Sequence, residues 1–204
     1  KRDSWKTAGG ILTGFGMLFV GLGMMSGSME DFARMDAVKV FLASISNPIL
    51  LVLIGAIFTA IIQSSSVMTS VAITMVVTGL ISLNQGIYLT LGSNIGSCVV
   101  AIIAGMTSGK NAKRTALMHL IFNCFGVVVF LIAALVMYLV TKGQISFGTI
   151  FEDMFPDAPQ VQLAMFHTIF NCLTVIIILP LTNLLVKTVC AIIPDNLSEE
   201  EGQA

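Results

Sequence analysis

Residues 48–82 read PILLVLIGAIFTAIIQSSSVMTSVAITMVVTGLIS, and four consecutive polar residues, Gln63-Ser64-Ser65-Ser66, divide this segment into two apolar arms. The arms, 49–62 and 67–80, hold 14 residues each. A helix needs about 20 apolar residues to cross a bilayer, so neither arm crosses comfortably. Polar backbone is tolerated at that depth only where protein or a watery cavity surrounds it. The segment therefore predicts a re-entrant helical hairpin with Gln63 to Ser66 at its tip.

The remaining sequence has the composition of a membrane protein. Hydrophobic residues make up 56% of the 204 residues and charged residues only 10%, whereas a soluble domain carries about 25% charged residues. Asp, Glu, Lys and Arg are absent from 40–109, 115–141 and 158–186, which together are long enough for several crossings. We expect an all-α, polytopic protein of the cell inner (cytoplasmic) membrane, with a membrane domain over 1–194 and a polar acidic tail over 195–204.

Upstream of the hairpin, the sequence predicts one span and one helix at the membrane surface. Residues 7–29 are apolar and rich in glycine, which lets membrane helices approach one another closely. Residues 30–46 interleave charged and apolar side chains, as an amphipathic interfacial helix does. Asn47-Pro48 ends that helix and begins the next one, because proline is favoured in the first helical turn. The sequence begins at Lys1 rather than methionine, and we interpret it as a piece of a longer chain.

Downstream of the hairpin, the sequence predicts three more spans. The run Gly92-Ser93-Asn94-Ile95-Gly96-Ser97 interrupts the apolar pattern of 88–106. We therefore expect this helix to be broken in the middle of the membrane, as in transporters whose broken helices line an ion site. Two uninterrupted spans follow at 115–141 and 160–186.

Basic residues near the ends of spans indicate which loops face the cytoplasm. They cluster at 1–6 and at 110–114, so both segments are predicted to lie inside. The chain between them must then cross the membrane an even number of times. This count is satisfied by one span at 7–29, a hairpin that returns to its own side, and the broken span at 88–106. If residues 48–82 crossed the membrane instead, the number of crossings would be odd.

The last two spans share a short repeated sequence motif, which we call the echo motif. Six residues recur 48 positions later: Ala116, His119, Ile121, Phe122, Asn123 and Cys124 as Ala164, His167, Ile169, Phe170, Asn171 and Cys172. Within each copy the histidine and the asparagine are four residues apart, so they share one helix face. A hydrogen-bonded polar contact between helices is the favoured interpretation, and proton sensing or substrate contact is the alternative.

The hairpin and the interrupted segment predict an ion-binding site. A helix that begins near Ser64 presents free N–H groups and the positive end of its dipole, which favour an anion. A half-helix that begins near Ser97 would repeat this arrangement, with Asn94 beside it as donor and acceptor. Serine and threonine hydroxyls, together with carbonyls freed at helix ends, suit a sodium ion. Because 40–109 contains no charged residue and no histidine, a bound anion requires a co-bound cation.

Three other interpretations of these residues stay open. Each serine of the triplet can be helix-packing material, since small hydroxyl residues are common between membrane helices. A passive ion channel would also use hydroxyl and backbone oxygens. An intramembrane serine protease would pair a serine with His119 or His167, yet the uncharged stretches lack an acidic residue to orient the histidine. We expect neither an enzyme nor a nucleic-acid-binding protein, and no cofactor or metal other than sodium as the coupling ion.

A family resemblance rests on the QSSS run at 63–66, the GSNIGS run at 92–97 and the two histidine-containing runs of the echo. With these motifs the chain resembles the bacterial sodium/phosphate cotransporters, relatives of the animal type II phosphate carriers, from about Leu18 to Pro194. Members of that family have two inverted repeats, each with a QSSS hairpin. The resemblance implies that phosphate and sodium bind where the two hairpin tips meet.

The resemblance assigns site residues by position. Phosphate-binding residues are implied at Gln63, Ser64, Ser65, Ser66, Ser93, Asn94 and Ser97. Sodium-binding residues are implied at Gln63, Ser64, Ser65, Thr69 and Asn94. Polar helix contacts are expected at His119, Asn123, His167 and Asn171, and no catalytic residue is expected. The GSNIGS run stands where the family usually has GANIGT, which keeps the small and hydroxyl character.

Only one QSSS run is present, so the chain resembles the second repeat of the family with its trailing helices. We expect the other half of the site to come from a second QSSS repeat in the same longer chain, or from a second copy of this chain. Family members often continue into a cytoplasmic PhoU-like domain, and the tail after Pro194 is a fitting junction.

The implied function of the 1–194 transport domain is secondary active transport in a lipid membrane. It would carry inorganic phosphate by sodium-coupled symport across the cytoplasmic membrane, through alternating access of the hairpin against a scaffold. The alternative is a half-transporter or fragment that is inactive without a second QSSS repeat. Both interpretations stay open, because the residues of this half-site would be the same in an active transporter and in an inactive half.

Overall fold

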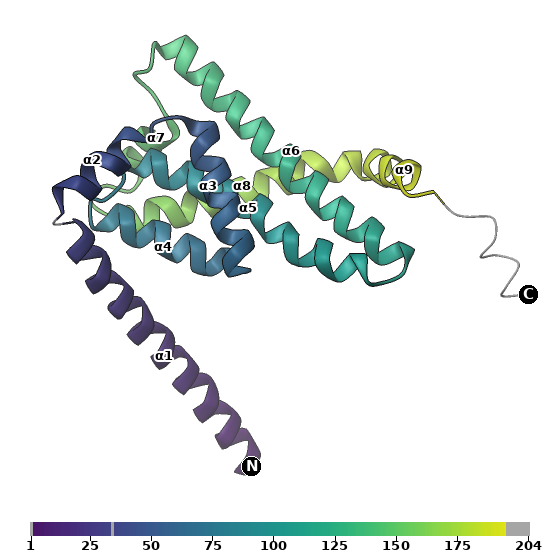
Figure 1. Cartoon of the computed structure of the whole chain (residues 1–204), viewed down its shortest axis with the longest axis horizontal. Coiled ribbons are helices and arrows are strands. Elements are labelled where there is room, and N and C mark those ends of the chain that lie inside the picture. The colour runs from purple at the N-terminus through teal and green to yellow at the C-terminus, as the bar shows by residue number, and fades with distance from the viewer. Residues whose placement is uncertain (1, 34, 195–204) are drawn as a thin grey trace, which may run out of the picture.

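The computed structural model describes residues 2–33 and 35–194, and every regular element in this part of the chain is a helix (Figure 1). The all-α prediction is confirmed. The predicted acidic tail lies outside the described residues. In chain order the elements are α1 (Arg2–Ala33), α2 (Asp36–Ser44), α3 (Pro48–Ile62), α4 (Ser65–Val77), α5 (Leu83–Met106), α6 (Lys110–Thr141), α7 (Phe147–Met154), α8 (Pro159–Ile178), the 3-10 helix η1 (Leu179–Leu181) and α9 (Thr182–Ile192).

The helices α3 and α4 form a hairpin that turns where the sequence predicts. Asn47 caps α3, because its side-chain oxygen accepts hydrogen bonds at 2.9 and 3.2 Å from two N–H groups of the first turn. Pro48 is the first helical residue. α3 ends at Ile62, since Gln63 adopts a left-handed conformation with φ of 59°, and Ser64 then caps α4. A helical hairpin is thus present, and its re-entrant position in the membrane stays a prediction.

The helix α5 is continuous through 92–97, so the predicted break there is wrong. The polar side chains of this run bond to their own helix instead. Ser93 and Asn94 donate to the carbonyl of Thr90, at 2.8 and 2.9 Å. Ser97 donates to the carbonyl of Asn94 at 2.7 Å. Such bonds satisfy hydroxyl and amide hydrogens without opening the backbone, so no second helix begins near Ser97.

The glycines of this run serve close helix packing. α3 and α5 run parallel and make the most extensive helix contact among the described residues. A Cβ atom added to Gly92 would lie 2.8 Å from the backbone carbonyl carbon of Val52. One added to Gly96 would lie 2.7 Å from Cβ of Thr59, and one added to Gly55 would lie 2.9 Å from a backbone carbon of α5. Only glycine permits this approach of the two backbones.

Phenylalanine side chains hold α6, α7 and α8 together. Phe166 of α8 lies at the centre, with ring-centroid distances of 6.0 Å to Phe130 and 5.6 Å to Phe151. Its distance to Phe147 is 5.5 Å, and Phe170 contacts Phe130 at 4.8 Å. Edge-to-face and tilted ring pairs of this kind add stability beyond the area they bury. The cluster therefore fixes the orientation of α8, which carries the second copy of the echo.

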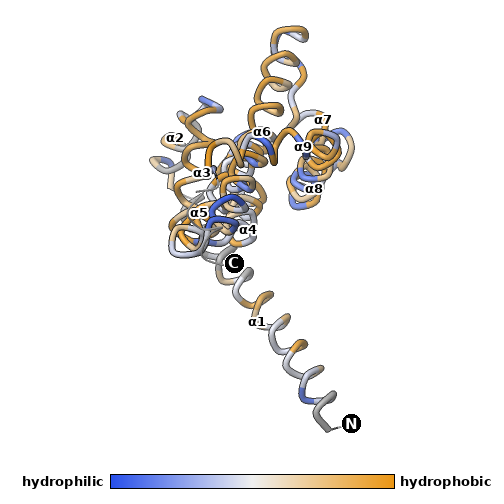
Figure 2. The backbone as a smooth tube through the Cα atoms, turned by 90° about the vertical axis from the view of Figure 1, so that its right-hand side faces the viewer, coloured by the Kyte–Doolittle hydropathy of each residue, from blue (hydrophilic) through white to orange (hydrophobic). Residues whose placement is uncertain are grey.

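Three described segments are long and apolar enough to cross a membrane: Leu83–Met106, Lys110–Thr141 and the combined Pro159–Ile192. Figure 2 shows hydrophobic residues along most of α6. These spans confirm a multi-pass membrane protein. The last span is interrupted by η1 at Pro180, because proline lacks the N–H group that an α-helix requires. The break in a spanning helix therefore lies at Pro180 rather than at 92–97.

The N-terminal region differs from the predicted surface helix over 30–46. α1 continues to Ala33, since no proline precedes Pro48 to end it, and the next helix, α2, is confined to Asp36–Ser44. The 32 residues of α1 extend about 48 Å at 1.5 Å per residue, more than the hydrocarbon core requires. Over most of its length α1 projects away from the other helices (Figure 1). Its predicted crossing at 7–29 stays a prediction.

The contact between α3 and α5 predicts the effect of Gly92→Ala. We expect the free energy of unfolding to fall by about 1–3 kcal/mol, because the new methyl group overpacks the interface. Gly10→Ala in α1 is the matched control, since nothing lies within 4 Å of its Cβ position and alanine favours a helix by about 1 kcal/mol. Thermal unfolding in detergent, followed by circular dichroism, measures both. Equal melting temperatures for the two variants would contradict the described contact.

Candidate functional site

The hairpin tip (Gln63 to Ser66) is built around the N-terminus of α4. The Ser64 hydroxyl oxygen caps this helix by accepting a hydrogen bond from the N–H group of Val67 at 3.3 Å. The first N–H groups of a helix have no partner within the helix, so those of Ser65 and Ser66 can reach a ligand. Ser64 and Ser65 are half-buried, and Gln63 and Ser66 are exposed. The tip therefore presents N–H donors and a positive dipole end, which suit an anion.

The α5 cluster (Ser93, Asn94 and Ser97) has the opposite chemistry. The hydroxyl hydrogens of Ser93 and Ser97 and one amide hydrogen of Asn94 are bonded to carbonyls of the same helix. These side chains consequently offer mainly oxygen lone pairs, which coordinate cations. Ser93 is 0% exposed and Asn94 is 7% exposed, while Ser97 is half-buried. Buried neutral oxygens of this kind match the surroundings that sodium takes in transporters.

The hairpin tip and the α5 cluster lie toward the same part of α5. Thr59, one turn before the tip, packs against Gly96, and α3 runs parallel to α5. α4 returns in the opposite direction and is joined to α5 by the short loop 78–82. In the described part of the chain, no hydrogen bond links the tip to the cluster.

Three buried threonine hydroxyls have no hydrogen-bond partner among the described residues: those of Thr59, Thr69 and Thr90. A buried hydroxyl without a partner is costly, so each is a candidate for contact with an ion or with a further chain segment. Thr69 is among the predicted sodium ligands, whereas sequence reasoning missed Thr59 and Thr90. Helical spacing could have found them, because Thr59 precedes Gln63 by four residues and Thr90 precedes Ser93 by three.

The two echo motifs contact α5 at Asn94 and at Cys98, which are four residues apart. In each copy the asparagine donates to the carbonyl of the histidine four residues earlier, at 2.9 Å from Asn123 to His119 and at 2.8 Å from Asn171 to His167. In the first copy Asn123 also donates to Sγ of Cys98 on α5, at 3.4 Å. In the second copy Nε2 of His167 lies 3.4 Å from Oδ1 of Asn94. Both copies thus contact α5 through polar groups one helical turn apart.

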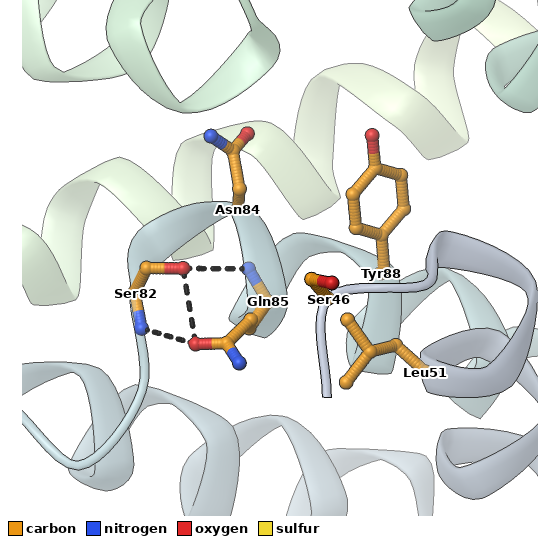
Figure 3. Close-up of a pocket in the computed structure, with 6 residues that line it drawn as sticks. All are labelled: Ser46, Leu51, Ser82, Asn84, Gln85 and Tyr88. Carbon is orange, nitrogen blue, oxygen red and sulfur yellow. Dashed lines mark hydrogen bonds between the residues drawn. The ribbon is translucent and has the colours of Figure 1, made fainter. Parts of the chain in front are cut away.

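A cavity of about 370 Å³ lies at the beginning of α3 and α5, away from the hairpin tip (Figure 3). Its lining residues are Ser46, Leu51, Ser82, Asn84, Gln85 and Tyr88. Leu51, the lining residue on α3, lies about 18 Å along the helix from Gln63, at about 1.5 Å per residue. Sequence reasoning did not point to this cavity, because its residues meet only through the parallel packing of α3 and α5.

Two amide side chains at this end fasten the first turn of α5 to neighbouring segments. Asn84 donates to the hydroxyl oxygen of Ser146 and accepts from the N–H group of Gly148, both at 2.9 Å. Gln85 donates to the carbonyl of Ile45 at 3.0 Å. These bonds join the linker before α3, the residue that caps α7 and the first turn of α7 to α5. They fix the end of the hairpin that lies opposite the tip.

Asn84→Ala tests this connection. We expect a loss of about 1–3 kcal/mol in the free energy of unfolding, because two hydrogen bonds disappear and their partners are left unpaired. The exposed Asn111 at the start of α6 provides the control, and Asn111→Ala should stay within about 0.5 kcal/mol of the unmutated protein. Thermal unfolding in detergent measures both. Ser146→Ala should cost less in the Asn84→Ala background than alone, and strictly additive losses would contradict the bond.

Comparison with known proteins identifies relatives of the chain. "Uncharacterized protein YqeW" of Bacillus subtilis (strain 168) is 35% identical over 142 residues, which cover 70% of this chain and 43% of that protein. "Sodium-dependent phosphate transport protein 2B" of Homo sapiens is 44% identical over 82 residues, covering 38% of this chain and 12% of that protein. "Putative inorganic phosphate export protein YjbB" of Escherichia coli (strain K12) is 30% identical over 119 residues, covering 58% and 22%.

The matched regions are short relative to those proteins, since the chain spans less than half the length of each of the three. No solved structure matches the chain. The model of the family described as Na+/Pi-cotransporter matches residues 21–154, which include both the hairpin tip and the α5 cluster. The chain therefore belongs to the Na+/Pi-cotransporter family.

Proposed function

We propose that the chain forms one half of a sodium-coupled phosphate transport site, with phosphate at the hairpin tip and sodium beside the α5 cluster. The family description names both ions, and the human and Escherichia coli relatives have phosphate transport or export in their names. This is the function that a neutral, oxygen-rich site inside a membrane supports best.

The observation that carries the proposal is the separation of hydrogen-bond donors from acceptors. The N–H groups at the start of α4 can donate to phosphate oxygens. The hydroxyls of Ser93 and Ser97 have their hydrogens committed to helix carbonyls, so their oxygens are left to coordinate sodium. Residues 40–109 carry no charge, and a buried anion there requires a cation for neutralisation. Binding of one ion then raises the affinity for the other.

The proposal keeps the positional assignments at the hairpin tip, where Gln63, Ser64 and Ser65 are assigned to both ions and Ser66 to phosphate, and it keeps Thr69 and Asn94 as sodium ligands. Ser93 and Ser97 move from the phosphate set to the sodium set, because their hydroxyl hydrogens are bonded to helix carbonyls. The partnerless hydroxyl of Thr69 supports its place in the sodium set, because a coordinated ion would supply the missing interaction.

A second QSSS repeat completes the site in this proposal, from the same longer chain or from a second copy. The chain covers only 43% of its Bacillus subtilis relative, which leaves room for another repeat and for a PhoU-like domain there. Large apolar side chains on α3, including Leu53, Ile57 and Phe58, are more than half exposed. In a membrane such a surface is covered by lipid or by further helices.

Transport in the proposed direction is inward, since an inward sodium gradient drives symport toward the cytoplasm. Phosphate export is the second candidate, and the name of the Escherichia coli relative is the observation that favours it. The two candidates differ in the direction of net phosphate movement and share the same binding chemistry.

Uptake of radiolabelled phosphate into proteoliposomes tests the proposal. A longer protein that includes a second QSSS repeat should accumulate phosphate above the outside concentration under an inward sodium gradient, and not under a potassium gradient. The chain alone should show little uptake, because half of the site is missing. Accumulation by the chain alone would mean that two copies complete the site. Downhill, sodium-independent flux would contradict symport and indicate a channel, and net efflux from loaded vesicles would favour export.

Ser65→Ala tests the tip within the same assay. We expect a loss of sodium-dependent uptake of about tenfold or more, because the variant lacks a ligand oxygen at the start of α4. The control is Ser108→Ala, whose hydroxyl donates at 2.8 Å to the carbonyl of Ala104 at the far end of α5. That variant should transport like the unmutated protein. Similar losses in both variants would count against the tip as the binding site.

A further inference from the structure

His167 reaches the α5 cluster from a different helix. It lies on the membrane-spanning helix α8 and is half-buried, and its Nε2 atom lies 3.4 Å from Oδ1 of Asn94. An imidazole inside a membrane segment is uncommon and is a functional candidate by default. Its partner is one of the cluster oxygens, so the contact links α8 directly to the proposed sodium position.

The orientation of the Asn94 amide follows from its two contacts. Its Nδ2 atom donates to the carbonyl of Thr90 at 2.9 Å, which turns Oδ1 toward α8. An amide oxygen has no hydrogen, so Nε2 of His167 must carry the proton of this bond. The histidine hydrogen bond occupies one lone pair of Oδ1 and leaves the second lone pair for another partner. The amide oxygen of Asn94 is thereby held in a fixed direction, with one lone pair left to coordinate a cation.

Packed neighbouring residues hold the backbone of His167 in place. The neighbouring side chains Phe166 and Phe170 are each 1% exposed and belong to the phenylalanine cluster between α6, α7 and α8. The side chain of Asn171 bonds to the carbonyl of His167 at 2.8 Å. A ring carried on such a rigid helix can orient a neighbouring amide with little loss of conformational entropy.

We propose that His167 is a positioning residue that fixes the amide oxygen of Asn94 as a ligand for the coupling cation. This inference rests on the proposed function, and it adds a residue that acts through Asn94 rather than on the ion itself. Residues that orient a metal ligand in this way typically change ion affinity by about 10- to 100-fold when they are removed. The maximal transport rate should change much less than the sodium affinity.

His119 supplies a matched comparison within the same chain. It occupies the corresponding position of the first echo motif, yet its side chain is exposed, and the motif contacts Cys98 of α5 through the His119 carbonyl and the Asn123 side chain. The two copies therefore share backbone bonding and differ in where the imidazole goes. Only the second imidazole meets a cluster oxygen.

The test compares sodium binding of the purified protein and three variants. The readout is the rise in melting temperature in detergent as sodium chloride replaces potassium chloride, which gives a half-saturating sodium concentration. His167→Leu should raise that concentration about tenfold or more, because leucine fills the space and cannot donate a hydrogen bond. His167→Gln should stay within about threefold, because its amide N–H group can replace Nε2. His119→Leu should not change the value.

The outcomes separate this inference from the proposed transport. An equal sodium requirement in the His167→Leu variant and the unmutated protein would overturn the positioning role, and so would equal effects of His167→Leu and His167→Gln. A longer protein with a second QSSS repeat that shows no sodium-specific stabilisation would also overturn it. A further outcome would separate the two proposals. If sodium stabilises the protein in a way that depends on His167, but neither the chain alone nor a longer protein with a second QSSS repeat takes up phosphate, the positioning role is supported and the transport proposal is contradicted.

Discussion

The close backbone contact between α3 and α5 is the constraint on which the rest of the structure depends. Gly55, Gly92 and Gly96 leave no room for a Cβ atom between the two helices. In a membrane the hydrophobic effect does not drive helices together, so close van der Waals packing between small residues has to do so. The contact places the polar turn after α3 about one helical turn beyond Gly96 along α5, because Thr59 packs against Gly96. It also holds α5 as a single helix, whose remaining faces are available to α4, α6 and α8.

A division of hydrogen-bonding roles follows from this arrangement. The turn at Gln63 starts a new helix, and the first N–H groups of a helix are donors without internal partners. The continuous α5 has no such free groups in its middle, so its serines donate to carbonyls of their own helix and keep oxygen lone pairs as acceptors. One element consequently favours an anion and the other a cation. Neither element carries a formal charge, so an anion held at one would need a cation at the other.

The echo motifs show how one local pattern takes two roles. In both copies the asparagine bonds to the histidine carbonyl four residues earlier, which is a property of the helix alone. The surroundings then differ. The phenylalanine cluster sets the orientation of α8 so that His167 meets Asn94, whereas the side chain of His119 remains exposed. A repeated motif therefore predicts the backbone geometry and does not predict which partner the side chain finds.

The sequence by itself determined the helical class, the long spans, the Asn47-Pro48 start and the turn at Gln63 to Ser66, because composition, proline and capping residues act locally. It also pointed to the tip, the α5 cluster and Thr69 as candidate ligands. Only the tertiary structure decided that α5 stays unbroken, since glycine permits both a break and a close helix contact, and the neighbouring α3 selects the second. The same holds for the contact of His167 with Asn94 and for the cavity between the starts of α3 and α5, which join residues far apart in the chain through packing that no local pattern encodes.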